Sequence, residues 1–252
     1  MDGVRERKPY NSRLFGAILL LFAVLGVALI IYRIASYKYE FDEKFYPVDY
    51  GRYNFLSYFT VLSNLLGYFY LFMLSFACFK NDKAKKIAFN PTLKLMTVEY
   101  TVISGIVYLA GLSMGFSSPL TFDTTAHFMM SVMQVFYHII MPLIMIILLF
   151  LPATSEKLSP KKAWLFGIFP LVYSVFSIFR GAASALHFYP YPFYKPDFFW
   201  GMVFKDKPIE NIKAYIILIP FLFAGILLFV LIALIIILIH NKLTGGKENG
   251  SD

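Results

Sequence analysis

Hydroxyl and amide side chains recur at helical spacing in the second long apolar stretch of the chain. Thr60, Ser63 and Asn64 share one face of a helix, and Ser57 and Gly67 extend it in both directions. Such a row is typical of close helix packing in a membrane. It could also do chemistry, with Thr60 or Ser63 as a nucleophile and Asn64 as an orienting or oxyanion-binding amide.

A second polar row lies in the fourth apolar stretch. His127, Ser131, Gln134 and His138 follow one another at intervals of three or four residues, and Pro142 comes four residues later. His138 is the most available proton acceptor in the chain, because imidazole titrates near neutral pH. A hydrogen-bonded structural role for His138 stays equally open. His127 lies near the outer boundary, where an interfacial role is favoured.

One arginine lies within the fifth apolar stretch. Arg180 is about two turns from the outer end, where its side chain could snorkel, pair with an acid or bind an anionic substrate group. Glu99 in the third stretch and Asp123 at the start of the fourth are the candidate acids. Polar groups in lipid are costly, so each of these residues is a candidate functional group.

An aromatic, proline-rich loop follows the fifth stretch. Tyr189 and Tyr191 alternate with Pro190 and Pro192, and Pro196 comes soon after, so the helix cannot continue here. Aromatic residues are typical of a membrane interface. The loop could also be a lid over the outward mouth of the polar interior.

The segment Gly111-Leu-Ser-Met-Gly115 fits the Gly-x-Ser-x-Gly pattern of serine hydrolases. That motif requires a strand, a turn and a helix, whereas this one ends an apolar stretch with no strand pattern nearby. The same letters fit Gly-x-x-x-Gly, which lets two helices approach closely. We therefore expect a packing role and do not assign Ser113 to catalysis.

Composition and apolar runs predict the elements that must position these residues. Of 252 residues, 59% are hydrophobic and only 15% charged, too few charges for a water-covered surface. Six stretches are long enough to cross a bilayer as helices. They span residues 13–36, 54–79, 91–115, 122–151, 162–187 and 213–240. The prediction is an all-α integral membrane protein, a single six-helix bundle over 13–240 with tails 1–12 and 241–252.

Lysine and arginine predict the orientation, because cytoplasmic loops are enriched in them. One side carries Arg5, Arg7, Lys8, Arg13, Lys80, Lys83, Lys85, Lys86, Lys94, Lys157, Lys161, Lys162, Lys242 and Lys247. The other side carries Lys38, Lys44, Arg52, Lys195, Lys205, Lys207 and Lys213. Both tails are therefore expected in the cytoplasm, with the protein in the cell membrane. This topology accounts for the net charge of +8, because the excess of lysine and arginine lies in the expected cytoplasmic segments. The charge therefore gives no support to nucleic-acid binding.

The sequence predicts neither a metal site nor a cofactor. Its one cysteine, Cys78, cannot form an internal disulfide, and the four histidines do not match a standard zinc pattern.

Three segments together resemble a known family. These are Tyr58-Phe-Thr-Val-Leu-Ser-Asn64, His138-Ile-Ile-Met-Pro142, and Arg180-Gly181 followed by Tyr189-Pro-Tyr-Pro-Phe193. In order and spacing they resemble the bacterial six-helix membrane proteins of the Pr-six-Pr family. That family is distantly similar to the androgen-induced intramembrane threonine hydrolases, which act on fatty acid esters of hydroxy fatty acids.

The resemblance implies a threonine on the second helix, here Thr60, paired with a histidine on the fourth, here His138. The Ser63-Asn64 pair and the His-x-x-x-Pro spacing depart from the eukaryotic pattern. This departure concerns the expected substrate more than the pairing of Thr60 with His138. With both tails inside, Thr60 lies roughly 10 Å and His138 about 15–20 Å below the outer boundary. Helix tilt can absorb that difference, so a contact is permitted.

The leading hypothesis is a membrane hydrolase of a lipid or fatty-acyl ester with Thr60 as nucleophile and His138 as general base. Supporting roles fall to Asn64 and Ser63 around the oxyanion, and to Arg180, Gln134, Tyr189 and Tyr191 in substrate binding. The alternatives are a small transporter or lipid-binding protein without catalysis, in which the polar rows line a path, or an acyltransferase that uses the same pair.

Overall fold

The computed structural model describes residues 9–36, 51–115, 117, 119–184, 187–204 and 211–245. All regular secondary structure in these ranges is helical. In chain order the elements are α1 (Arg13–Ser36), η2 (Asn54–Ser57), α2 (Phe59–Cys78), α3 (Asp82–Ala88), α4 (Pro91–Ser113), α5 (Thr125–Val135), η3 (Phe136–Ile140), α6 (Met141–Phe150), η4 (Pro160–Gly167), α7 (Ile168–Ala183), η5 (Pro192–Tyr194), α8 (Pro196–Phe204) and α9 (Asn211–Gly245).

Six helical stretches in the described ranges are long and apolar enough to cross a membrane. They are α1, α2, α4, the run α5–η3–α6, the run η4–α7, and α9 from Lys213 onward. The predicted all-helical class is thereby confirmed for these ranges, and the six helices indicate a multi-pass membrane protein. The side on which each loop lies stays a prediction. Of the expected tails 1–12 and 241–252, residues 1–8 and 246–252 lie outside the described residues, as do Lys38, Lys44, Lys205 and Lys207, which are expected on the outer side.

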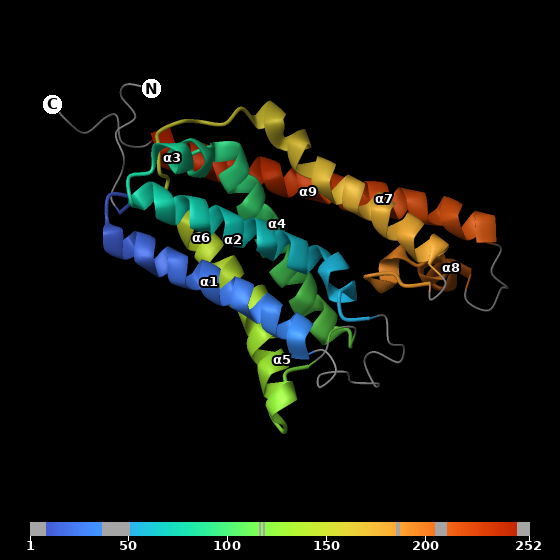
Figure 1. Cartoon of the computed structure of the whole chain (residues 1–252). Coiled ribbons are helices and arrows are strands. Elements are labelled where there is room, and N and C mark those ends of the chain that lie inside the picture. The colour runs from blue at the N-terminus through green and yellow to red at the C-terminus, as the bar shows by residue number, and fades with distance from the viewer. Residues whose placement is uncertain are drawn as a thin grey trace.

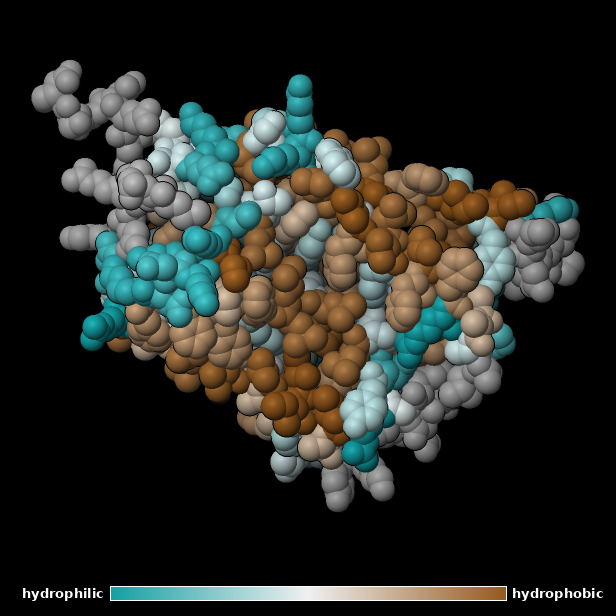
Figure 2. Space-filling model, turned by 45° about the horizontal axis from the view of Figure 1, so that its top comes forward, coloured by the Kyte–Doolittle hydropathy of each residue, from teal (hydrophilic) through white to brown (hydrophobic). Residues whose placement is uncertain are grey.

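The spans form one bundle in which α2 and α4 are central (Figure 1). The helix α2 packs against α1 and α4, α4 packs against α6, and α9 packs along the run η4–α7. The beginning of α1 and the end of α9 lie at the same end of the bundle, beside α3 (Figure 1). Hydrophilic side chains gather at that end (Figure 2), where α3 carries Lys83, Lys85 and Lys86.

Polar side chains tie the helix ends together there. Asn81 caps α3 by accepting the N–H of Ala84, and Asn90 caps α4 by accepting the N–H of Leu93. The carbonyl oxygen of Leu151, at the end of α6, accepts hydrogen bonds from the Tyr10 hydroxyl and from the Lys94 ammonium. The α3 end is thus fixed by hydrogen bonds between helix ends. A large apolar core runs through the bundle, with buried polar side chains such as Asn64 and Glu99 within it.

Large apolar side chains cover much of the outer surface (Figure 2). Leu14 on α1 is 72% exposed, Phe179 on α7 is 71% exposed and Phe223 on α9 is 67% exposed. Soluble monomers rarely expose such a contiguous apolar surface. A lipid environment accounts for it, because the side chains then contact acyl chains.

Candidate functional site

The first turn of α2 is capped by tyrosines from elsewhere in the chain. Tyr58 at the N-cap position makes no side-chain capping bond. Instead the Tyr173 hydroxyl accepts the N–H of Phe59 at 2.9 Å, and the Tyr191 hydroxyl accepts the N–H of Thr60 at 3.2 Å. Two amides that a helix leaves without internal partners are satisfied in this way. The Tyr191 hydroxyl also lies 3.2 Å from Thr60 Oγ1.

Ser63 and Asn64 both bind the carbonyl of Thr60. Ser63 Oγ donates to that oxygen at 2.9 Å and Asn64 Nδ2 at 2.8 Å. Asn64 Nδ2 also donates to the carbonyl of Tyr137 at 3.2 Å. Both hydrogens of the amide are therefore engaged, which favours the orienting role for Asn64 over oxyanion binding. Its Oδ1 is buried without a hydrogen-bond partner.

The fourth span is interrupted by a π-helical turn, η3, and its cause is local. Pro142 has no N–H, and in a regular helix its ring would clash with the carbonyl of His138 four residues earlier. The helix widens instead, and the N–H of Met141 bonds to the carbonyl of Phe136, five residues earlier. The His138 carbonyl lies against Gly105 of α4, where a Cβ would be 2.7 Å from it. Such turns are frequent at functional sites.

The ring of His138 is fixed by α4. It stacks on Tyr108 with 4.0 Å between ring centroids and 8° between planes. Its Nδ1 lies 3.3 Å from the carbonyl oxygen of Ser104. A carbonyl can only accept, so Nδ1 carries the hydrogen and Nε2 of the neutral ring keeps the lone pair. This orientation suits a proton acceptor.

Thr60 and His138 are connected indirectly. Asn64 joins the carbonyl of Thr60 to that of Tyr137, the residue before His138. Among the described residues, however, the hydroxyl of Thr60 bonds to Tyr191 and the ring of His138 to Ser104, not to each other.

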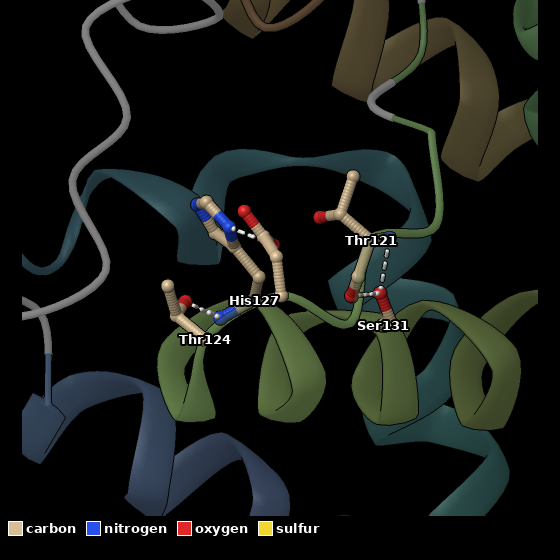
Figure 3. Close-up of polar contacts among 5 residues, drawn as sticks. Thr121, Thr124, His127 and Ser131 are labelled. Atoms are coloured by element: carbon tan, nitrogen blue, oxygen red, sulfur yellow. Dashed lines mark hydrogen bonds and ion pairs between the residues drawn. The ribbon is translucent and has the colours of Figure 1, made fainter.

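The polar row predicted for the fourth span divides into separate contacts (Figure 3). His127 Nδ1 lies 2.6 Å from a carboxylate oxygen of Asp123, while Ser131 Oγ donates to the carbonyl of Thr121 and accepts its N–H. Gln134 is half-buried, and in the described part of the chain its side chain makes no hydrogen bond. The row is thus no continuous polar track to His138.

The Asp123–His127 contact lies outside the bundle core, at the start of α5. The hydrogen bond from His127, together with backbone hydrogen bonds, holds the pKa of Asp123 below its usual range. Asp123 is therefore hydrogen-bonded to His127 and, among the described residues, makes no ion pair with Arg180.

Arg180 lies over the aromatic loop at the end of α7. Its Nη2 donates to Asn54 Oδ1 at 2.5 Å, and its guanidinium lies 5.0 Å from the ring centre of Phe188. Among the described residues, its buried Nη1 has no hydrogen-bond partner. Glu99 is also buried without one, near the backbone of Ala233 in α9. The Glu99–Arg180 pair considered from the sequence is thus not formed among the described residues.

The aromatic loop packs onto the start of α2 and the end of α7. The ring of Tyr189 lies over Gly181, where a Cβ would be 2.2 Å from Cε1 of that ring. This explains why glycine follows Arg180. Tyr191 stacks on Phe193 with 5.2 Å between centroids and packs edge-on against Tyr58. Burial raises the pKa of Tyr191, so its hydroxyl keeps its proton.

Three partners in the site were given no role in it from the sequence: Ser104, Asn54 and the capping hydroxyl of Tyr173. Ser104 contacts His138 through its backbone carbonyl, and the side-chain types in a sequence give no sign of such a contact. The described residues hold no cluster of three or more His, Cys, Asp or Glu suited to a metal ion.

No family model, curated protein or solved structure matches the chain. The resemblance drawn from the motifs therefore stays a prediction, and the function must be argued from the geometry.

Proposed function

We propose that the protein is a multi-pass membrane hydrolase of a lipid or fatty-acid ester, with Thr60 as nucleophile and His138 as general base. The observation that carries the proposal is the arrangement of His138. Its Nδ1 is held by a backbone carbonyl, its Nε2 is left as the acceptor, and Asn64 joins its π turn to the turn of α2 that holds Thr60.

The reaction has two stages, acylation of Thr60 and hydrolysis of the acyl-threonine. His138 Nε2 takes the proton of Thr60 Oγ1 as that oxygen attacks the acyl carbonyl, and the proton then passes to the departing alkoxide, which leaves an acyl-threonine and an alcohol. Water then attacks the acyl-threonine and gives a proton to His138. That proton returns to Thr60, and a fatty acid leaves. The first step requires the Thr60 hydroxyl to leave Tyr191 and reach His138.

Arg180 is the proposed anchor for an anionic group on the substrate. Its unpartnered Nη1 has a hydrogen to donate, and Asn54 and Phe188 hold its plane. Guanidinium binds carboxylate and phosphate well. Tyr189, Tyr191 and the half-buried Gln134 are proposed as further substrate contacts.

A second candidate is lipid binding or transport without catalysis. The contact that favours it is the hydrogen bond of Thr60 to Tyr191 in place of His138. Acyl transfer to an alcohol other than water would use the same residues as hydrolysis.

The test is ester hydrolysis by purified protein in detergent, using p-nitrophenyl esters of fatty acids. Thr60→Ala and His138→Ala should each abolish turnover, and Thr60→Ser should retain part of it. Ser113→Ala is the matched control, since Ser113 is an exposed hydroxyl that donates only to the carbonyl of Ala110. Turnover that persists in Thr60→Ala, or labelling by a fluorophosphonate at another residue, would refute the mechanism. Solute or lipid uptake into vesicles without turnover would favour the second candidate.

A further inference from the structure

The hydroxyl of Tyr191 touches the proposed nucleophile in two ways. It accepts the N–H of Thr60 at 3.2 Å and lies 3.2 Å from Oγ1 of the same residue. A substrate carbonyl that Thr60 attacks would need its oxygen in reach of a hydrogen-bond donor and its carbon beside Oγ1. The Tyr191 oxygen lies within reach of the Thr60 N–H and 3.2 Å from Oγ1, so it occupies the region in which the carbonyl group of the substrate would have to lie.

The other candidate hydrogen-bond donors near Thr60 already have acceptors. Asn64 Nδ2 donates to two carbonyls and Ser63 Oγ donates to the Thr60 carbonyl. The N–H of Phe59 donates to Tyr173. Among these groups, the Thr60 N–H is the one whose acceptor comes from the aromatic loop.

Resting on the proposed function, we infer that Tyr191 is a gate, defined as a side chain whose hydroxyl occupies the place of the substrate's carbonyl oxygen until substrate displaces it. When the gate opens, the Thr60 N–H becomes a donor for the oxyanion, and Oγ1 is released toward His138. The same movement therefore frees both the oxyanion donor and the nucleophile that the acylation of Thr60 needs.

We expect the aromatic loop to move as a unit, because its backbone is stiff. Tyr191 lies between Pro190 and Pro192, whose fixed φ angles stiffen the backbone. Side-chain hydroxyl contacts tie the segment from 188 to 195 to the bundle: Tyr191 to Thr60, Tyr194 to Ser174 Oγ at 3.0 Å, and Ser184 Oγ to the N–H of Phe188 at 3.1 Å. Its other contacts include the Arg180 guanidinium over the Phe188 ring and ring pairs such as Phe188 against Tyr58 at 6.0 Å between centroids. Apolar contacts of this kind can be exchanged for an acyl chain.

The first test is hydrolysis by Tyr191→Phe, which removes the hydroxyl and keeps the ring stack on Phe193. A gate predicts a rise of about fivefold in turnover, the effect of losing one competing hydrogen bond. A fall would show that Tyr191 is instead a donor to the reaction and would overturn the gate. Tyr173→Phe is the matched control, because it removes the neighbouring cap from Phe59 without touching Thr60 Oγ1; it should lower stability without raising turnover.

The second test does not depend on turnover. In a Cys78→Ala background, Thr60→Cys provides a single thiol whose alkylation by N-ethylmaleimide can be timed. Tyr191→Ala should speed alkylation at least fivefold, and Tyr173→Ala should not. Equal rates in the two variants, or no acceleration by Tyr191→Ala, would overturn the gate. If no variant hydrolyses any ester and Tyr191→Ala alone speeds alkylation, the gate stands and the hydrolase proposal falls.

Discussion

Gly105 is the position at which the structure can be tested most directly, because any side chain there meets the backbone of the π turn. A Cβ at Gly105 would lie 2.7 Å from the carbonyl oxygen of His138 and 3.0 Å from Cγ of Pro142. Neither atom is the end of a flexible side chain. The substitution Gly105→Ala must therefore push α4 and η3 apart.

The expected cost follows from two opposing effects. Overpacking of this kind costs about 1–3 kcal/mol, whereas replacing glycine by alanine inside a helix recovers about 0.5–1 kcal/mol. The net loss is about 1–2 kcal/mol, which for a chain of this size lowers Tm by about 2–8 °C. Thermal unfolding in detergent, followed by tryptophan fluorescence, measures it.

Gly225→Ala in α9 is the matched control, because nothing lies within 4 Å of a Cβ there. It should leave Tm unchanged or raise it. If Gly105→Ala is as stable as the parent protein, the close approach of α4 to the His138 carbonyl does not exist. Under the proposed function, Gly105→Ala should also reduce turnover of the remaining folded protein, since the ring of His138 shifts from Ser104.

Three further predictions concern other contacts. Gly181→Ala places a Cβ 2.2 Å from the Tyr189 ring and should make the loop from 187 to 195 more sensitive to protease, whereas Gly201→Ala, with open space around its Cβ, should not. Because the folded pKa of Asp123 is depressed, its contribution to the start of α5 is present above its unfolded pKa near 3.9 and is lost as pH falls through the folded value. Amide exchange at His127 and Phe128, corrected for intrinsic rates, should accelerate over that range, and Asp123→Asn should remove the pH dependence; a dependence that survives the substitution would contradict the assignment. Glu99→Gln should leave Tm within about 2 °C or raise it, because a neutral amide of the same shape replaces a buried acid that makes no ion pair among the described residues. A large drop would reveal a cation bound by Glu99.

The spans were predictable because membrane helices need long apolar runs, and such runs are local in sequence. The shared face of Thr60 and Asn64 was predictable for the same reason, since residues four apart in a regular helix are neighbours. In the structure Asn64 indeed bonds to the carbonyl of Thr60.

The row from His127 to His138 failed as a continuous track because it assumed one regular helix. The π turn that accommodates Pro142 interrupts the helical register just before His138. Ser131 satisfies the backbone of Thr121 instead. The His-x-x-x-Pro spacing held the relevant signal, because a proline removes the hydrogen-bond donor to the carbonyl four residues earlier.

The caps of α2 were beyond sequence reasoning for a different reason. Tyr173 and Tyr191 lie 114 and 131 residues from the amides that they accept. Hydroxyl groups of tyrosine occur throughout this aromatic chain, so composition does not mark these two. Only the packing of α7 and of the aromatic loop on the start of α2 selects them.

The Leu151 carbonyl at the α3 end has a consequence for biosynthesis. It accepts the Tyr10 hydroxyl, 141 residues earlier in the chain, as well as Lys94. During translation Tyr10 has no acceptor at this place until four spans have been made and inserted. The segment before α1 therefore docks after insertion rather than during it, and a bulky fusion close to Tyr10 is expected to slow completion of the bundle without blocking membrane entry of its first helices.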